Sequence, residues 1–183
     1  MNKPIVATAS LAGCFGCHMS ILDIDERILD LIELVEFHKS PINDIKKFTK
    51  ICDIGLIEGG CCNDENVHVL KDFRAHCKTL ISVGECAIMG GLPALRNPIS
   101  IKECLEEAYI SGPSVVGHNE EKIIPNDEEL PILLNKVYPC HEIVKMDYHL
   151  PGCPPKADLI WEALYALVSG NKMDLPYELI KYD

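Results

Sequence analysis

Residues 5–35, IVATASLAGCFGCHMSILDIDERILDLIELV, pass from a short apolar run through a glycine-rich turn into an amphipathic segment. The run from Ile5 to Ala9 is partly β-branched and predicts a buried strand. From Ile21 to Val35 apolar residues recur at helical spacing, with Asp and Glu on the opposite face. This pattern predicts a single helix, for which Ser20 and Asp23 form a plausible capping pair. A buried strand, a turn and a helix make the first βα unit of the chain.

The alternation of strand and helix continues beyond this unit. Apolar runs predict strands at residues 51–57, 79–83 and 142–148, and helical spacing predicts helices at residues 64–76, 100–109 and 155–168. Buried strands that alternate with helices indicate an α/β fold, a doubly wound, mostly parallel sheet of the flavodoxin-like type. We expect one domain over residues 1–183, with a surface excursion at 111–131 and a C-terminal tail at 170–183.

Charge and hydropathy exclude several classes of partner. Among the 183 residues, 17 Lys and Arg stand against 28 Asp and Glu, which gives a net charge of −11. A phosphate-backbone or anionic-membrane binder needs a basic surface, so neither nucleic acid nor membrane is an expected partner. No apolar run approaches the roughly 18 residues of a membrane-spanning helix. We therefore expect a soluble protein.

The cysteine content points to metal or redox chemistry. The chain holds 10 cysteines, about 5% of its residues, which is below the level of a secreted disulfide scaffold. The N-terminus resembles an export signal only weakly, because Pro4 interrupts it and Cys17 follows Cys14 closely. We therefore expect a cytoplasmic protein, and in a reducing compartment clustered cysteines bind metals or carry out redox reactions.

Four of the cysteines follow predicted strands. Cys14 and Cys17 lie just after the first strand, Cys86 after the strand at 79–83, and Cys153 after the last one. A parallel sheet brings all of these turns to one edge, where doubly wound folds bind their ligands. Four thiolates at one edge suit a 4Fe-4S cluster, in which each iron takes one terminal cysteine. Glycines beside them let the backbone approach such a cluster closely: Gly13, Gly16, Gly84 and Gly152.

The residues alone leave two other functions open. A strand, a C-x-x-C pair and a helix also describe a thiol-disulfide oxidoreductase that uses Cys14 and Cys17. This interpretation gives Cys86 and Cys153 no role. A zinc-stabilised binding module is the other alternative, although no second close ligand pair accompanies these cysteines. A flavin at the first turn is disfavoured because Cys14 to Cys17 fill that turn.

Three cysteine motifs in a fixed order also carry a family resemblance. The motifs Gly-Cys14-Phe-Gly-Cys17, Val-Gly-Glu-Cys86-Ala and Pro-Gly-Cys153-Pro-Pro resemble those of nickel-iron hydrogenase small subunits, relatives of the 20 kDa cluster subunit of respiratory complex I. The resemblance spans most of the chain. Within the family, residues 11–27 and the short length are most similar to the small subunit of soluble, bidirectional NAD-reducing hydrogenases.

The resemblance implies a role for the chain as well as a ligand set. It implies that Cys14, Cys17, Cys86 and Cys153 ligate one proximal 4Fe-4S cluster. That cluster would relay electrons between the nickel-iron site of a large subunit and a diaphorase module with iron-sulfur clusters and flavin, where NAD is reduced. The chain itself would not split hydrogen. The complex I subunit has adjacent cysteines in place of the C-x-x-C pair, and uptake hydrogenases carry a twin-arginine signal and further ligands after the last motif. No cysteine follows Cys153 here, which implies a single cluster and a cytoplasmic enzyme.

Other residues near the predicted strand ends have less decisive patterns. Cys52 and Cys104 lie among apolar residues and are expected in the core. The adjacent Cys61 and Cys62 follow another strand end, so an alternate ligand or an exposed thiol remains open beside a structural role. Glu58 lies at the same strand end and is either a carboxylate that acts on the site or an ordinary acidic residue. For His18 and His149, a structural or exposed role is favoured over ligation.

Overall fold

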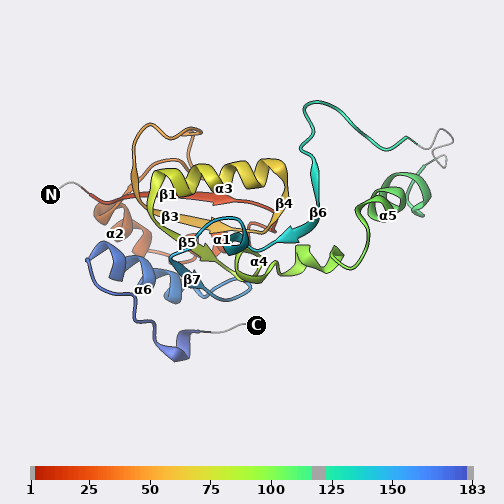
Figure 1. The fold of residues 1–183 in the computed structure, drawn as a ribbon. Helices are drawn as coiled ribbons and strands as arrows, with labels where there is room; N and C mark the ends of the chain where they lie inside the picture. The colour runs from red at the N-terminus through yellow and green to blue at the C-terminus, as the bar shows by residue number, and fades with distance from the viewer. Residues whose placement is uncertain (1–2, 117–122, 181–183) are drawn as a thin grey trace.

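The computed structural model of the protein describes residues 3–116 and 123–180 and is built around a five-stranded parallel sheet (Figure 1). Its strands run in the order β2-β1-β3-β5-β7, and each neighbouring pair is parallel. Their bounds are β1 Ile5–Ser10, β2 Glu36–Phe37, β3 Cys52–Glu58, β5 Cys77–Val83 and β7 Tyr148–Leu150. This is the flavodoxin-like strand order, in which the chain reverses direction across the sheet between β1 and β3. The predicted fold class is confirmed.

Helices cover both faces of the sheet. On one face lie α1 (Gly16–Leu22), α2 (Arg27–Leu34) and α6 (Ala157–Val168), and on the other lies α3 (Asp64–His76) (Figure 1). The strands feed both faces because their side chains alternate. In β1, for example, Val6 packs in the core under α1, α2 and α6, and Ala7 packs in the core with Leu70 and Phe73 of α3. Both cores are apolar and buried.

The segment predicted as one helix from Ile21 to Val35 consists of two. α1 ends at Leu22 and α2 begins at Arg27, with Asp25 in the left-handed region at φ 60° between them. An Asp tolerates this conformation better than most residues, and the break lets α1 start at the site edge while α2 follows the sheet. Ser20 is no cap, because it lies inside α1 and its hydroxyl donates to the carbonyl of Pro155.

The remaining predictions are confirmed in part. The helix at 64–76 has the predicted bounds, with Asn63 as its N-cap. The last strand, expected at 142–148, forms at Tyr148–Leu150, and a 3-10 turn, η3 (Cys140–Glu142), occupies the start of the predicted segment. An unexpected two-stranded antiparallel sheet pairs β4 (Cys61–Asn63) with β6 (Leu133–Tyr138). Because β6 is mostly solvent-exposed, its apolar pattern is weak.

Short helices follow β5 and lead away from the sheet. They are α4 (Glu85–Met89), the 3-10 helix η1 (Leu92–Arg96), α5 (Ile101–Glu106) and the π-helical turn η2 (Glu107–Ser111). The predicted excursion at 111–131 is irregular over 112–116 and 123–131, and residues 117–122 lie outside the described part. Near the C-terminus, η4 (Tyr177–Leu179) is a single turn. Within the described residues no helix combines the length and apolar character needed to cross a membrane.

One half-buried ion pair fixes β7 beside β5. The Arg74 guanidinium donates to Asp147 Oδ2 at 2.7 Å and to the Cys77 carbonyl at 2.6 Å, and Asp147 Oδ2 also accepts from the Leu80 N–H. Burial alone raises the pKa of Asp147, but the hydrogen bonds from Arg74 and Leu80 outweigh it and hold that pKa below its ordinary value. The contacts set the start of β7, so that the turn after it reaches the same sheet edge as the turn after β5.

Candidate functional site

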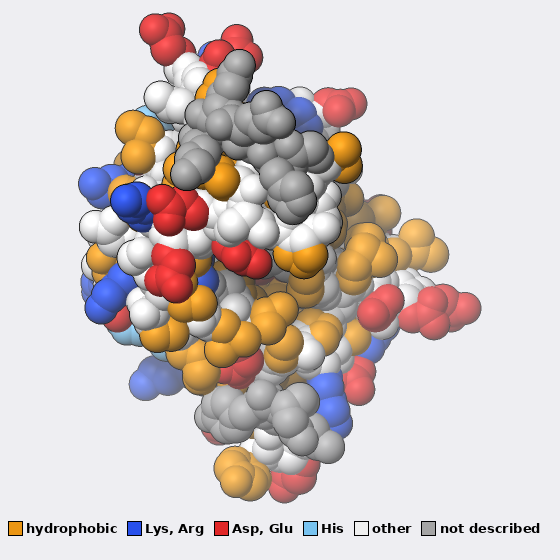
Figure 2. All heavy atoms as spheres, turned by 90° about the vertical axis from the view of Figure 1, so that its right-hand side faces the viewer, with side chains coloured by type: hydrophobic (Ala, Val, Ile, Leu, Met, Phe, Trp, Pro, Cys, Tyr) orange, Lys and Arg blue, Asp and Glu red, His pale blue; other side chains and the backbone are white. Residues whose placement is uncertain are grey.

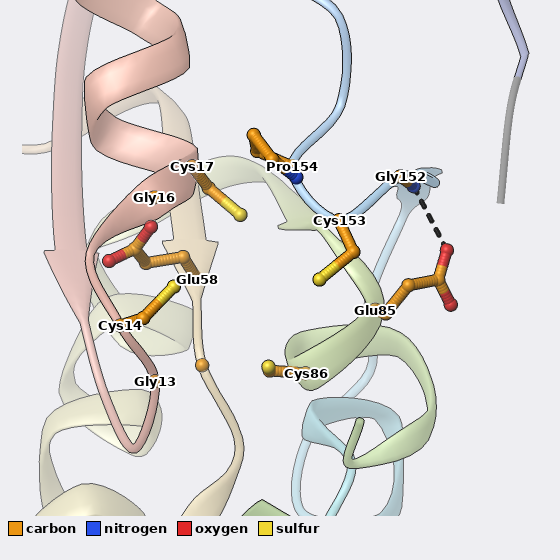
Figure 3. A pocket seen from close by; sticks show the side chains of 11 residues that line it. Gly13, Cys14, Gly16, Cys17, Glu58, Glu85, Cys86, Gly152, Cys153 and Pro154 are labelled. Atoms are coloured by element: carbon orange, nitrogen blue, oxygen red, sulfur yellow. Dashed lines mark hydrogen bonds between the residues drawn. The ribbon is translucent and has the colours of Figure 1, made fainter. Parts of the chain in front are cut away.

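A cavity opens at the carboxyl end of the sheet, where the segments that follow β1, β3, β5 and β7 meet. It occupies about 370 Å³ including its mouth. All four predicted cysteines line it, and in Figure 3 their sulfur atoms point into the same space. Cys14 and Cys153 are exposed at the mouth, whereas Cys17 and Cys86 are half-buried. The structure therefore brings together residues that lie up to 139 positions apart in the sequence (153 − 14).

The first two cysteines are placed by a tight turn after β1. Phe15 takes a left-handed conformation at φ 67° and stands at the N-cap position of α1. Its ring stacks on the His18 ring, with centroids 4.6 Å apart. This stacking holds an otherwise unfavourable backbone conformation. As a result, Cys14 lies in the turn and Cys17 in the first turn of α1, both facing the cavity.

The other two cysteines are tied to each other through Glu85 and Gly152. The Gly152 N–H donates to the Glu85 carboxylate at 2.9 Å, and the Glu85 N–H donates to the Gly152 carbonyl at 3.1 Å. The Glu85 side chain is buried, and each bond joins the residue before Cys86 to the residue before Cys153. Sequence reasoning gave Glu85 no role. The sequence signal that could have identified Glu85 is its position between Gly84 and Cys86 at the end of a predicted strand.

Glu58 reaches the cavity from the end of β3. Its side chain is 3% exposed and accepts hydrogen bonds from Ser10 Oγ at 2.6 Å and the His18 N–H at 3.0 Å. The His18 ring lies close as well, with Nδ1 3.3 Å from Oε1. Burial alone raises the pKa of Glu58, but the hydrogen bonds from His18 and Ser10 outweigh it and hold that pKa below its ordinary value. Glu58 is therefore a fixed, ionised carboxylate at the wall of the cavity.

The cavity disfavours free thiolates. Burial, followed by the charge of Glu58, raises the pKa of Cys17 far above its ordinary value. Burial also raises the pKa of Cys86, only partly offset by a hydrogen bond from the Leu92 N–H. A bound metal supplies the positive charge that a thiolate needs in such surroundings.

The donor set and the shape of the cavity fit a cluster. A Cβ at Gly84 would clash with Cys17 Sγ, and one at Gly91 would lie 2.9 Å from Cys86 Sγ, so these glycines leave room for the sulfur atoms. Gly84 also has φ +82°, which a side chain rarely adopts. Among the described residues, no three His, Cys, Asp or Glu side chains form a group that could hold a single metal ion. Four sulfurs surround one shared space instead, an arrangement that suits a four-iron cluster.

Cys52 and Cys104 were both expected in the core, and the structure confirms this for Cys52 alone. Cys52 is buried as predicted, opposite Cys77 on the neighbouring strand. Cys104 is not in the core: it lies half-buried in α5, a helix without a buried residue. The α5 segment leaves the body of the molecule, which its local helical spacing could not reveal.

The adjacent pair after β3 turns away from the site. Cys61 is buried, and a hydrogen bond between its side chain and the Cys140 thiol lowers the pKa of Cys61. The Cys62 thiol lies 3.3 Å from Asn66 Oδ1 and donates to it. Neither residue lines the cavity. His18 is buried and packed, and the exposed His149 lies against His141, with ring centroids 6.3 Å apart.

Fold and site together define an α/β protein of flavodoxin-like topology with a four-cysteine site where the strand order reverses. The family described as "NADH ubiquinone oxidoreductase, 20 Kd subunit" matches residues 14–167, and the chain belongs to this family. Its similar relatives place it on the hydrogenase side of the family. The delta subunit of the NAD-reducing hydrogenase HoxS of Cupriavidus necator is 47% identical over 182 residues, which cover 100% of this chain and 87% of that subunit.

Further comparisons agree with this placement. A subunit of the F420-non-reducing hydrogenase of Methanothermobacter thermautotrophicus is 42% identical over 96% of this chain, which spans only 56% of that longer relative. A chain in the crystal structure of an NAD+-reducing [NiFe]-hydrogenase in the H2-reduced state superposes with a TM-score of 0.94 at 50% identity, with 100% of both chains covered. A [NiFeSe]-hydrogenase chain of Dm. baculatum, at 15% identity and a TM-score of 0.60, shares the fold; the match covers 92% of this chain and 63% of that one. The chain is a hydrogenase-type member of the family.

Proposed function

We propose that this chain is the electron-transfer small subunit of a cytoplasmic NAD-reducing nickel-iron hydrogenase. One observation carries the proposal: Cys14, Cys17, Cys86 and Cys153 come from three separate turns and line one cavity. In the proposed role these residues hold one 4Fe-4S cluster through their thiolates. When bound, the cluster supplies a one-electron redox centre.

The chain's own residues would hold and shield this centre. The turns after β1, β5 and β7 supply the sulfur ligands, and the bonds between Glu85 and Gly152 keep two of these turns at a fixed separation. Glu58, held by Ser10 and His18, lines the wall beside Cys17. Outer groups of this kind orient ligands and tune the potential of a cluster.

The proposed partners follow from the names of the relatives. One relative is a subunit of an NAD-reducing hydrogenase, and the solved structure that superposes over the full chain is an NAD+-reducing [NiFe]-hydrogenase. We place hydrogen activation in a large partner subunit that holds the nickel-iron site. Electrons would pass through the cluster of this chain to a diaphorase module with iron-sulfur clusters and flavin, where NAD is reduced.

The thiol-disulfide alternative finds less support in the site. Such an enzyme needs only the C-x-x-C pair at the start of a helix, here Cys14 and Cys17. The alternative leaves Cys86 and Cys153 unused, although both line the same cavity as Cys14 and Cys17. It predicts that Cys14→Ser abolishes insulin reduction while Cys86→Ser leaves it intact.

Single serine variants test the proposed ligand set. We expect Cys14→Ser, Cys17→Ser, Cys86→Ser and Cys153→Ser each to lower the iron content and visible charge-transfer absorption of anaerobically purified protein. Cys104→Ser, outside the site, is the matched control and should leave both unchanged. Full iron content in Cys86→Ser and Cys153→Ser would contradict the proposed ligand set.

A further inference from the structure

The helices that follow Cys86 present their apolar side chains to solvent. Leu92 is 72% exposed and Leu95 70%. Met89, at the end of α4, and Ile99, after η1, are exposed as well. We call these four residues the η1 face. Neither η1 nor α5 nor η2 contains a buried residue, although globular helices of this composition usually bury their apolar side.

The segment that carries the η1 face is hydrogen-bonded to the backbone of β6. The Arg96 guanidinium donates to the Leu134 carbonyl at 2.8 Å and the Asn135 carbonyl at 3.2 Å. Asn97 exchanges two hydrogen bonds with the backbone of Val137, at 2.8 and 3.0 Å. The polar side chains of this segment thus bond to β6, while its leucines face solvent. A preformed apolar surface of this kind marks an interaction site.

The η1 face is directly connected to the proposed cluster site. The backbone just before Leu92 packs against Cys86, since a Cβ at Gly91 would lie 2.9 Å from Cys86 Sγ, while the Leu92 side chain projects into solvent. Met89 belongs to the same short helix as Cys86. A protein seated on this face would therefore lie close to a proposed cluster ligand.

An acidic arm borders the η1 face. The arm comprises residues 100–116 and 123–132, extends away from the sheet in Figure 1, and carries six acidic residues against one lysine. Figure 2, which views the molecule from the side of the arm, shows hydrophobic side chains gathered between acidic ones. The acidic residues of the arm are Glu103, Glu106, Glu107, Asp127, Glu128 and Glu129. A complementary surface is therefore apolar at its centre and basic at its rim.

We propose that the η1 face and the acidic arm form the docking surface for a redox partner subunit, whose contact surface is apolar and ringed by Lys and Arg. A second copy of this chain is a poor occupant, because it would bring another net charge of −11 against the acidic arm. The inference rests on the proposed electron-transfer function, since it names the surface through which the Cys86 side of the site exchanges electrons.

The test uses the purified multi-subunit complex with Leu92→Glu plus Leu95→Glu in this chain. We expect a partner subunit to dissociate at least tenfold more readily, measured by mass photometry at serial dilution, while the iron content of this chain stays unchanged. Leu29→Glu is the matched control, because Leu29 is similarly exposed, at 63%, on α2 at the other end of the molecule. The control should retain every subunit.

A second variant tests the charge of the arm without touching the apolar face. Glu103→Gln plus Glu107→Gln should weaken the complex at low salt and reduce the dependence of its dissociation on ionic strength. Retention of all subunits in both double variants would overturn the inference, and so would a homodimer of this chain that the leucine variant disrupts. Wild-type protein that contains no iron in the intact complex would instead refute the proposed function. Failure of the docking inference and failure of the proposed function therefore give different results.

Discussion

Glu58, at the end of β3, links its own strand to the end of β1 and to the first helix. Its carboxylate accepts hydrogen bonds from Ser10 Oγ at 2.6 Å and from the His18 N–H at 3.0 Å, and it lies 3.3 Å from the His18 ring nitrogen Nδ1. His18 follows the proposed ligand Cys17 directly. On its other side, Nε2 of the His18 ring lies 2.9 Å from the Thr8 hydroxyl. Glu58 thereby fixes the position of α1 relative to the cavity.

Glu58→Ala should lower the free energy of unfolding by about 1–3 kcal/mol, because the buried N–H of His18 and the hydroxyl of Ser10 would lose their acceptor. Glu58→Gln, which keeps one acceptor oxygen, should lose less. The pKa of Glu58 lies below its ordinary value of 4.5. Its contribution is therefore present above about pH 4.5 and is lost as the pH falls through the folded-state pKa.

Chemical denaturation at pH 7 and at pH 4 measures both effects. The difference in stability between wild type and Glu58→Gln should shrink at the lower pH. An equal difference at the two pH values would show that the charge of Glu58 contributes nothing to stability.

Glu85→Ala should loosen the turn that carries Cys153. The substitution removes the carboxylate that accepts the Gly152 N–H at 2.9 Å, and a buried hydrogen bond to a charged group contributes about 1.5–3 kcal/mol. We expect faster release of iron to a chelator at a fixed denaturant concentration. Glu65→Ala, at an exposed glutamate of α3 outside the cavity, serves as control. Equal release rates in Glu85→Ala and wild type would argue against a positioning role for Glu85.

Gly84→Ala should abolish assembly of the site. Its φ of +82° disfavours any side chain, and the new methyl group would clash with Cys17 Sγ. Gly170→Ala is a matched control, because Gly170 has φ +72° and nothing lies within 4 Å of the added Cβ. Strain alone should cost Gly170→Ala about 1–3 kcal/mol of stability and leave the iron content unchanged. If both variants kept their iron, the close packing of Gly84 against Cys17 would be irrelevant to the site.

Alkaline pH should destabilise the protein through the buried Cys77. Burial, with a further effect of the neighbouring Cys52, raises the pKa of Cys77 from 9.0 to about 12. The stability associated with the neutral thiol is complete below about pH 9 and is lost as the pH rises toward about 12. Denaturation midpoints at pH 8 and 10.5 should fall more steeply for wild type than for Cys77→Ala. Parallel curves for the two proteins would contradict this assignment.

Much of the architecture could be predicted from the sequence, because buried strands and α3 have strong, local hydrophobic patterns. The four cysteines could be predicted to share one edge, since parallel strands end on the same side. Three features could not. The break at Asp25 depends on a single left-handed residue, β6 is too exposed to show a strand pattern, and Glu85 acts through Gly152, a partner 67 positions away. The core position expected for Cys104 was wrong because helical spacing does not tell which surface, if any, covers a helix.

The central claim is that Cys14, Cys17, Cys86 and Cys153 hold one four-iron cluster, and it is tested most directly by quantifying iron and acid-labile sulfide in anaerobically purified protein. We predict about four iron and four sulfide per chain, the composition of a 4Fe-4S cluster. Protein from an intact complex that contained stoichiometric zinc, or neither iron nor sulfide, would contradict the account.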